Sequence, residues 1–428
     1  RLASIYLVAV ILLGTCLFLI MRSATKYFEQ AFPKYDELNA SVQENVSAIR
    51  VVKAYVREDY ETGKFHKASE NIYKIFCKAE ENLSFNAPLM QLTVYSCILL
   101  ISWLGAKMIV GSSLSTGELM SLLTYCMNIL MSLMMLSMVF VMITMSLASA
   151  RRISEVLNEK SDLDNPENPD FSIPDGSITF DHVYFNYKKG AGEPVLSDIN
   201  LSIQSGETIG IIGGTGSAKT SLVNLISRLY DITDGSVKVG GKDVRSYDME
   251  TLRNEVAVVL QKNVLFSGTI LDNLRWGDKN ASEEECKRVC RLACVDEFID
   301  RMPEGYNTYI EQGGSNVSGG QKQRLCIARA LLKKPKVLIL DDSTSAVDTA
   351  TDAKIRKAFL TEIPETTKLI IAQRISSVQD ADRIIVMENG KVNGFGSHEE
   401  LLKTNEIYRE VYESQTGGGG DFDEKRGE

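Results

Sequence analysis

A glycine-rich stretch in the middle of the chain has residue types and spacing that suit phosphate binding. The sequence "ETIGIIGGTGSAKTSLVNLI" is typical of a buried strand, a tight turn and a helix. In the template G-x-x-x-x-G-K-[ST], backbone N–H groups at the helix start hold phosphates, the lysine neutralises their oxygens and the hydroxyl holds Mg²⁺. Gly213, Gly216, Lys219 and Thr220 fit this template. The predicted phosphate-binding set is Gly213, Gly214, Thr215, Gly216, Ser217, Ala218, Lys219, Thr220 and Ser221.

Ala218 is a departure inside this loop, because the template has glycine at its position. A Cβ atom there costs about 1–2 kcal/mol if the backbone must adopt a positive φ, since that region is strained for residues other than glycine. The cost is close to zero if the residue already lies in the first turn of the helix. The sequence leaves both possibilities open.

Two later stretches carry further groups for phosphate chemistry. The apolar run in "VLILDDSTSAVD" predicts a strand that ends at Asp341 and Asp342, which brings one carboxylate to Mg²⁺ and a second to a water molecule. Upstream, Ser318 and two glycines open a predicted helix and form a second anion-binding N-terminus. This second site lies too far along the chain from Lys219 to serve the same phosphates without a partner.

These stretches together resemble the nucleotide-binding domain of ABC transporters. The segment from Val317 to Gln321 is close to the signature sequence LSGGQ, Asp341 ends the Walker B strand, and the D-loop reaches Asp348. The resemblance extends over the whole chain, and implies that two such domains face each other head to tail. Each signature then closes on the ATP held by the other domain.

The resemblance also implies roles for individual residues. Tyr187 is expected to stack on adenine, and Gln261 to reach toward Mg²⁺ and the coupling helices. The implied metal ligands are Thr220, Gln261 and Asp341. Further nucleotide contacts are implied for Val317, Ser318, Gly319, Gly320, Gln321 and Asp348.

At the implied catalytic positions the chain departs from the family. A glutamate that polarises the attacking water and a histidine that supports the γ-phosphate are replaced here by Asp342 and Gln373. Aspartate is shorter by one methylene, about 1.5 Å, and a misplacement near 1 Å can lower a rate ~100-fold. The signature is intact apart from Val317 in place of leucine. This combination resembles the degenerate half of bacterial heterodimeric multidrug exporters.

We therefore expect an ATP-driven exporter subunit whose partner, a second ABC half-transporter, supplies the competent catalytic site. The assembled pair is expected to be an ABC-type ATPase with ATP and Mg²⁺ as cofactors, in which this chain's own site is weakly hydrolytic. Two alternatives remain. The chain could be an ATP-binding regulatory subunit that gates a channel or senses nucleotide, or a slow homodimeric exporter.

Three uncharged runs are long enough to cross a bilayer as helices: Leu2 to Met21, Asn82 to Ala106 and Leu119 to Ala150. Residues 22–81 hold ten Lys/Arg, which places them in the cytoplasm by the positive-inside rule. Everything after Ala150 is then also cytoplasmic, in a multi-pass protein of the cell membrane. An extracellular start without a signal peptide predicts further membrane segments upstream.

The expected fold class is an α-helical membrane bundle, similar to that of type I ABC exporters, joined to an α/β P-loop domain with a helical subdomain. Residues 1–157 form the partial transmembrane domain, in which Val51 to Glu61 resembles a coupling helix. Residues 158–176 are proline-rich and acidic and predict a linker. The nucleotide-binding domain is expected over residues 177–414, followed by a disordered tail over 415–428.

The third apolar run has two features of a pathway for cargo. Ser121, Tyr125, Asn128 and Ser132 recur at helical spacing and fall on one face. The same run carries eight of the 14 methionines, which favours adaptable packing or an apolar cavity. No charged residue accompanies them, so an apolar or amphipathic cargo is expected. The eight are Met120, Met127, Met131, Met134, Met135, Met138, Met142 and Met145.

Composition excludes some other classes. The net charge is −9 and the excess of acid lies in the C-terminal part, which argues against a non-specific nucleic-acid binder. Cys286, Cys290 and Cys294 recur every four residues on one predicted helix without the paired hooks of a zinc site. We expect them to form a buried, inert stripe rather than a metal site.

Overall fold

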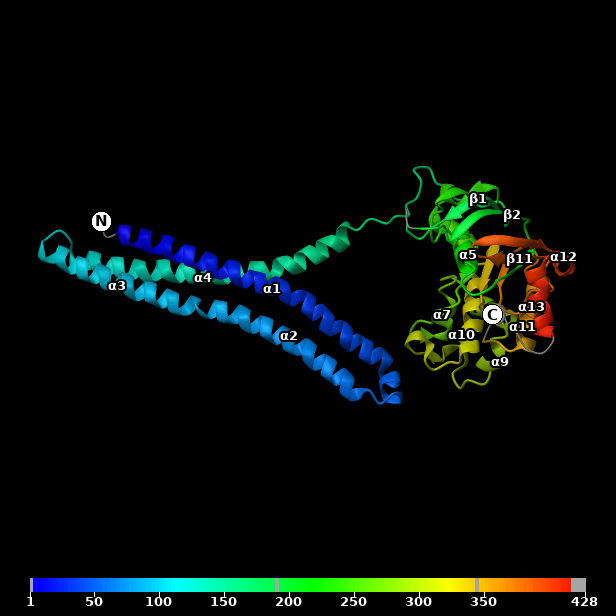
Figure 1. Cartoon of the computed structure of the whole chain (residues 1–428), viewed down its shortest axis with the longest axis horizontal. Coiled ribbons are helices and arrows are strands. Elements are labelled where there is room, and N and C mark those ends of the chain that lie inside the picture. Colours follow the sequence, from blue (N-terminus) through cyan, green and yellow to red (C-terminus); the bar gives the residue numbers. More distant parts are fainter. Residues whose placement is uncertain (1–2, 189–191, 343–345, 417–428) are drawn as a thin grey trace. The chain divides into compact units, whose positions relative to one another are not determined.

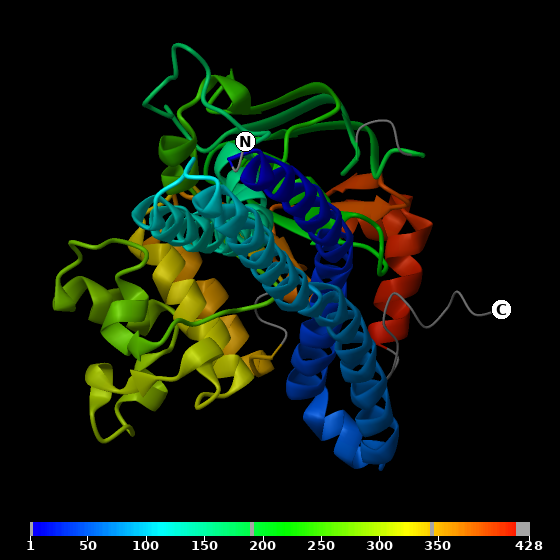
Figure 2. The ribbon, with the colours of Figure 1, turned by 90° about the vertical axis from the view of Figure 1, so that its left-hand side faces the viewer.

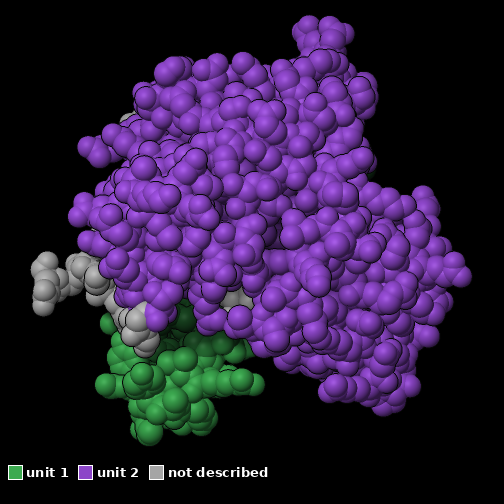
Figure 3. All heavy atoms as spheres, turned by 90° about the vertical axis from the view of Figure 1, so that its right-hand side faces the viewer, with its two compact units in different colours: residues 1–160 green, residues 161–428 purple. Residues whose placement is uncertain are grey.

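The structure is a computed structural model that describes residues 3–188, 192–342 and 346–416 (Figure 1). The chain divides into two compact units, Arg1–Lys160 and Ser161–Glu428, which Figure 3 distinguishes by colour.

Long helices make up the first unit, and Figures 1 and 2 show how they run side by side. They are α1 (Ala3–Ala54), α2 (Glu58–Ser84), α3 (Asn86–Val110) and α4 (Thr116–Asn158). Within the described residues, three segments are long and apolar enough to cross a membrane, as predicted. With 52 residues, α1 extends to ~78 Å, far more than a hydrocarbon core of ~30 Å requires. The polar half of α1 therefore continues beyond the membrane beside α2.

The membrane part of this unit has a small core of its own. Leu13, Leu17, Met90, Cys97, Ile101 and Cys126 are buried where α1, α3 and α4 meet. The hydroxyl of Tyr6 donates a hydrogen bond to the carbonyl of Leu122 at 2.6 Å, which joins α1 to α4. A Cβ atom on Gly105 would collide with Leu119, so glycine lets α3 and α4 approach closely.

The second unit contains a six-stranded sheet in the order β12-β11-β3-β10-β9-β6. Its strands are β3 (Thr208–Ile212), β6 (Val256–Val259), β9 (Val337–Asp341), β10 (Thr367–Ile371), β11 (Arg383–Glu388) and β12 (Lys391–Gly396). All neighbours pair in parallel except β12, which is antiparallel to β11. Every residue of β3, β9 and β10 is buried, because both faces of the central sheet are covered.

A smaller antiparallel sheet, β2-β1-β4-β5, shares a hydrophobic core with α5 (Lys219–Ile226) and one face of the large sheet. Its strands are β1 (Ile178–Phe185), β2 (Leu196–Ile203), β4 (Asp234–Val239) and β5 (Lys242–Asp243). Ile173, in the predicted linker, is buried in this core, and Asp170 pairs with Tyr247 in an isolated bridge. The second half of the predicted linker, from Asn165 onward, is thus hydrogen-bonded and packed within the second unit.

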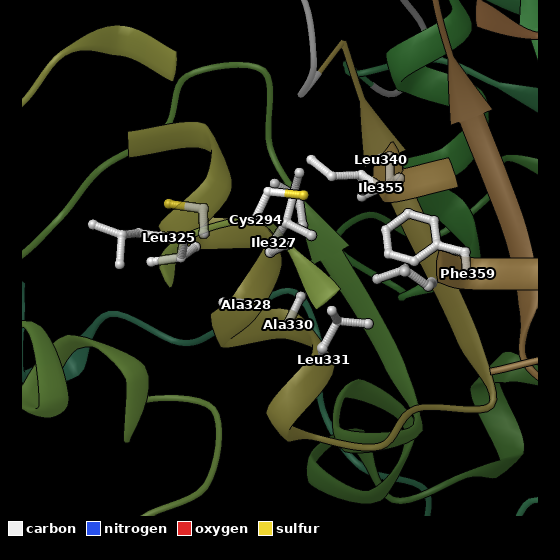
Figure 4. Packing of buried hydrophobic residues seen from close by; sticks show 14 of the residues in the cluster. Cys294, Leu325, Ile327, Ala328, Ala330, Leu331, Leu340, Ile355 and Phe359 are labelled. Atoms are coloured by element: carbon white, nitrogen blue, oxygen red, sulfur yellow. The ribbon is translucent and has the colours of Figure 1, made fainter. Parts of the chain in front are cut away.

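The other face of the large sheet is covered by helices, which carry the second hydrophobic core of this unit. Figure 4 shows Ile355 and Phe359 of α11 (Thr349–Glu362) in this core with Leu340 of β9. The other helices and short strands are α6 (Met249–Glu255), β7 (Gly268–Thr269), α7 (Ile270–Leu274), α8 (Glu283–Leu292), α9 (Asp296–Ile299), β8 (Tyr309–Ile310), α10 (Gly319–Leu332), α12 (His398–Thr404) and α13 (Glu406–Thr416). Short 3₁₀ helices cover Val244–Ser246, Gly305–Asn307, Gln312–Gly314 and Ile375–Ser377.

The cysteine stripe lies inside this helical part, with Cys286, Cys290 and Cys294 all buried. Burial raises the pKa of the Cys290 thiol to about 12, so it stays protonated and unreactive at neutral pH. The described residues contain no group of three or more His, Cys, Asp or Glu side chains that could hold a metal ion.

The two units together form a helical membrane bundle followed by an α/β domain with a helical subdomain. This is the fold class that the sequence predicts.

Candidate nucleotide-binding site

The phosphate-binding loop connects β3 to α5. The side chain of Lys219, the first residue of α5, folds back over the loop, and its ammonium donates to the carbonyls of Gly213 at 2.7 Å and Gly214 at 2.9 Å. The ammonium also donates to the hydroxyl of Ser217, at 3.3 Å. A lysine ammonium thus lies at a helix N-terminus beside a glycine-rich turn, an arrangement that suits the phosphates of a nucleotide.

The backbone of Ala218 decides between the two possibilities that the sequence left open. Its φ is 70° and its ψ is 24°, so it lies in the left-handed region, immediately before the first residue of α5. A non-glycine residue there is strained by about 1–2 kcal/mol. Ala218 therefore stores strain at the base of the phosphate loop.

Replacing Ala218 with glycine should stabilise the second unit. We expect Ala218→Gly to raise its free energy of unfolding by about 1 kcal/mol, because relief of the left-handed strain exceeds the extra entropy of glycine in the unfolded chain. Thermal unfolding of the purified chain measures the effect. Ala353→Gly, at an exposed position inside α11, is the matched control and should destabilise by about 1 kcal/mol. Equal losses for both variants would contradict a strained Ala218.

Asp341 and Thr220 meet at the end of β9. The Thr220 hydroxyl donates to a carboxylate oxygen of Asp341 at 2.8 Å, although the two residues lie 121 positions apart. Burial raises the pKa of the Asp341 carboxyl, and the hydrogen bond from Thr220 and the charge of Lys219 oppose that effect. Mg²⁺ prefers one or two carboxylates together with phosphate oxygens and water. The hydroxyl and the carboxylate next to the phosphate loop fit this ion.

Gln261, the remaining predicted metal ligand, is exposed in this structure. It follows β6, which is the parallel neighbour of β9, and so it lies at the same edge of the sheet as Asp341. The structure brings Thr220 and Asp341 together, and among the contacts of the described residues none joins the Gln261 side chain to either of them.

Asp342 and Gln373 lie against each other at this same edge. The Gln373 amide nitrogen donates to a carboxylate oxygen of Asp342 at 3.1 Å. They meet because β9 and β10 are neighbours and Ile371 pairs with Asp341, so each residue lies just beyond its strand. The φ of Asp342 is 47°, a left-handed conformation that aspartate tolerates better than most residues. The two consecutive carboxylates thus diverge, one toward Thr220 and the other toward Gln373.

Gln415 is a residue that sequence reasoning missed. Its side-chain amide donates to the carbonyl of Gln373 at 3.0 Å and accepts from the backbone N–H of Ile375 at 2.9 Å. Gln415 belongs to α13, which ends at Thr416, and lies 42 positions from Gln373. The predicted disordered tail is therefore wrong at 415 and 416, and its remainder, 417–428, lies outside the described residues. No local motif marks Gln415, so only the packing of the last helix reveals that it holds the segment containing Gln373.

Tyr187 lies beside the phosphate loop. Its hydroxyl shares a hydrogen bond of 2.8 Å with the hydroxyl of Ser221, in the first turn of α5. Its ring is nearly perpendicular to the rings of Phe185 and Tyr230, at interplanar angles of 75° and 89°, with ring centroids 4.8 and 5.0 Å away. The residue remains 49% exposed. A ring that is anchored through its hydroxyl and remains partly open to solvent is able to stack on a base.

The signature residues form the start of α10. The hydroxyl of Ser318 accepts from the backbone N–H of Gln321, and the Gln321 side chain accepts from the backbone N–H of Ser318, which makes a capping box. Gly319 and Gly320 follow at the exposed end of the helix, and Val317 is buried beneath it. Backbone N–H groups at this N-terminus have no intrahelical acceptor.

The position of Asp348 is set by α11, whose first turn it caps by accepting from the N–H of Thr351 at 2.9 Å. This hydrogen bond holds the pKa of the Asp348 carboxyl below its usual range. Gln323 of α10 accepts from the N–H of Ala346 at 3.0 Å, which ties the signature helix to the segment before Asp348.

On α4, the polar face and the methionines are both exposed within the first unit. The hydroxyls of Ser121 and Ser132 donate back to carbonyls of their own helix, and Tyr125 is 61% exposed. Cys126 on the opposite side is buried against α1 and α3. The exposed methionines are Met120, Met127, Met131, Met134, Met135, Met138 and Met142; the side chain of Met145 lies outside the described part.

The predicted coupling segment includes the turn that connects α1 to α2. α1 ends at Ala54 and α2 begins at Glu58, and the intervening Tyr55 and Val56 are 75% and 80% exposed. Asn45 of α1 donates to Glu61 of α2 at 2.8 Å and fixes the pair of helices near the turn. The turn thus exposes Tyr55 and Val56 at the end of two helices that this hydrogen bond joins.

Comparison with known proteins agrees with this arrangement. The family model described as ABC transporter matches residues 196–345, and the model for the ABC transporter transmembrane region matches residues 1–134. The chain is 38% identical over 420 residues to the uncharacterized ABC transporter ATP-binding protein YfiB of Bacillus subtilis (strain 168), covering 97% of this chain and 72% of that protein.

Two further similarities concern named proteins. The chain is 37% identical over 395 residues to an ATP-dependent lipid A-core flippase of Desulfotalea psychrophila, covering 91% of this chain and 68% of the flippase. Among solved structures it is similar to a bacterial Atm1-family ABC exporter with ATP bound, with a TM-score of 0.90 and 27% identity, covering 97% of this chain and 73% of that one.

Proposed function

Because this chain belongs to the ABC transporter family and joins an exporter-type transmembrane region to a nucleotide-binding domain, we propose that it is the degenerate-site half of a heterodimeric exporter. In this proposal the chain binds ATP at a site that hydrolyses it poorly. Its signature completes the competent site of the partner half. The pair uses ATP to move apolar or amphipathic molecules out of the cell.

The hydrogen bond between Asp342 and Gln373 is the observation that carries the proposal. A catalytic carboxylate must reach the water that attacks the γ-phosphate. The carboxylate of Asp342 is one methylene, about 1.5 Å, shorter than that of glutamate, and Gln373 already holds one of its oxygens. A neutral amide at position 373 cannot carry the positive charge that a histidine can. Both features favour ATP binding over hydrolysis.

The chain's own residues have distinct tasks in the bound state. Lys219 and the loop N–H groups hold the phosphates, Thr220 and Asp341 hold Mg²⁺, and Tyr187 stacks on the base. The ion would neutralise charge on the β- and γ-oxygens of ATP. The N-terminus of α10 would aim its free N–H groups at the γ-phosphate bound by the partner, so the intact signature has a task even beside a weakened catalytic site.

The cargo class rests on α4 and on one relative. A face with Ser121, Tyr125, Asn128 and Ser132, next to exposed methionines, offers hydrogen bonds and polarizable apolar surface without charge. A relative of similar sequence is named as a flippase of lipid A-core, itself an amphipathic molecule. We therefore favour amphipathic cargo over ions or sugars.

Co-purification tests the heterodimer directly. Two differently tagged copies of this chain, co-expressed with a half-transporter that carries glutamate and histidine at the positions of Asp342 and Gln373, should each capture that partner and leave the other copy behind. Efficient capture of one tagged copy by the other would instead support a slow homodimeric exporter. Vesicle uptake of an amphipathic dye separates transport from a purely regulatory role, because a regulatory subunit binds ATP without supporting ATP-dependent uptake.

A further inference from the structure

A pocket of about 170 Å³ lies under α11, at the amino ends of β3 and β10. Its lining includes Thr208 of β3, Lys368 of β10 and Phe359 of α11, whose ring packs in the core shown in Figure 4. The phosphate loop follows the carboxyl end of β3, so the pocket lies at the opposite edge of the sheet from the nucleotide site. None of the residues predicted to bind nucleotide lines it.

The polar groups of the pocket come from two neighbouring strands. Lys368 and Thr208 are direct partners in the parallel pairing of β10 with β3, so both side chains point to the same face of the sheet. Both residues are more than nine-tenths buried, at 2% and 8% exposed. The strand register therefore places Lys368 and Thr208 side by side in the lining of the pocket.

These two groups are donors that lack a protein acceptor. The Thr208 hydroxyl is buried without a hydrogen-bond partner. Lys368 makes no side-chain hydrogen bond or ion pair with any residue that the structure describes, and Asp382 is the one charged group that acts on it from beyond ion-pair distance. Burial lowers the pKa of Lys368, as it does for an ammonium that has lost water without gaining an acceptor.

Two of the other three charged residues that line the pocket, Arg356 and Asp380, are paired with each other, and the third, Lys357, is not buried. Arg356 donates to Asp352 at 3.2 Å and to Asp380 at 3.3 Å, so its guanidinium is already engaged by two carboxylates. Lys357 is exposed at the rim. Apart from Ser377, whose hydroxyl donates to Asp352 at 3.4 Å, the remaining walls are apolar and include Phe359, Leu360 and Ile370. A pocket with free donors at its base and apolar sides is complementary to a ligand with an acceptor at one end and an apolar body.

We propose that this pocket binds a small organic carboxylate with a compact apolar body, such as an aromatic ring. The carboxylate accepts from Lys368 and Thr208 in charge-assisted hydrogen bonds, and the ring packs against Phe359 and Ile370. A cavity near 150 Å³ accommodates benzene, so an aromatic acid is of suitable size. The occupant would contact α11, which Asp348 caps, and the segment of Asp380 and Ala381 that follows Gln373.

A calorimetric titration of the purified full chain with benzoate tests the proposal. Benzoate should bind saturably with a Kd of about 1 mM, in keeping with the binding energy available per atom of a small ligand. Benzamide has the same shape without the charge and should bind at least ~10-fold more weakly, because neutral hydrogen bonds are weaker than charge-assisted ones. Partition into detergent favours the neutral benzamide, so stronger binding of benzoate cannot be explained by detergent.

Three variants locate the binding. Lys368→Met keeps the apolar stem and should weaken benzoate at least ~10-fold, whereas Lys357→Met at the rim should change affinity less than ~2-fold, because an exposed charge is screened. Thr208→Val tests the same site if Lys368→Met does not fold, and should weaken benzoate several-fold. Melting temperature and ATP binding report on folding. Equal affinity for benzoate and benzamide, unchanged affinity in Lys368→Met or Thr208→Val, or no saturable binding to the wild type would overturn the proposal.

Discussion

Gly319→Asp should lower the ATPase rate of the assembled transporter by roughly 10²–10³, because the signature N-terminus aims donors at the γ-phosphate in the partner's site and loss of one such donor has an effect of that size. An aspartate at the same place would also set a negative charge against the phosphate. Asp342→Asn, in contrast, should lower the rate no more than a few-fold, since Asp342 belongs to the site that hydrolyses poorly. Steady-state phosphate release and vesicle transport measure both variants.

The structure makes this comparison selective. A Cβ atom on Gly319 would lie 3.5 Å from the Cβ of Ala346, an ordinary contact, so Gly319→Ala controls for the added atom within this chain. At Gly320 a Cβ would lie 2.7 Å from the carbonyl of Ala346, and substitution there would disturb the helix itself. Asparagine tolerates the positive φ of Asp342. If Asp342→Asn proves as damaging as Gly319→Asp, Asp342 is a working catalytic base and the site is not degenerate.

The chain purified without a partner should bind ATP yet hydrolyse it at least ~100-fold more slowly than the assembled pair, because its shortened carboxylate misplaces the attacking water by ~1 Å. Binding of a fluorescent ATP analogue and single-turnover hydrolysis separate the two properties. Asp341→Asn is the control for binding, since it removes the carboxylate that meets Thr220 and should weaken Mg²⁺-dependent nucleotide binding. Turnover by the isolated chain that equals that of the pair would contradict the heterodimer.

Gain of activity provides a second check on the isolated chain. Asp342→Glu combined with Gln373→His supplies the reach and the titratable side chain that the site lacks. This double variant should raise hydrolysis above that of the wild-type chain, whereas Gln373→His alone should leave the short carboxylate limiting. An unchanged rate in the double variant would place the defect elsewhere, with Ala218 as the next residue to test.

The sequence alone determined those features of this protein that depend only on residues close together in the chain. Three apolar runs specify membrane helices through their length, because in a bilayer a single segment satisfies its backbone groups internally only as a helix. One short stretch of sequence predicts each of three elements: the phosphate loop, the strand ending at Asp341, and the helix that Ser318 caps. This is possible because strand, turn and capping propensities act over a few positions. The fold class follows from the order of these elements.

Other features were decided only by the tertiary structure, because they join residues far apart in the chain. The hydrogen bond from Thr220 to Asp341 and that from Gln373 to Asp342 exist because β9 has β10 as its neighbour and β3 beyond, an order that no local pattern encodes. The left-handed backbone of Ala218 is imposed by the turn into α5, against its own intrinsic preference. From its residue type alone, Lys368 is expected at the surface, because lysine is rarely buried. In the structure it is a buried donor, because strand pairing places it beside Thr208 under α11.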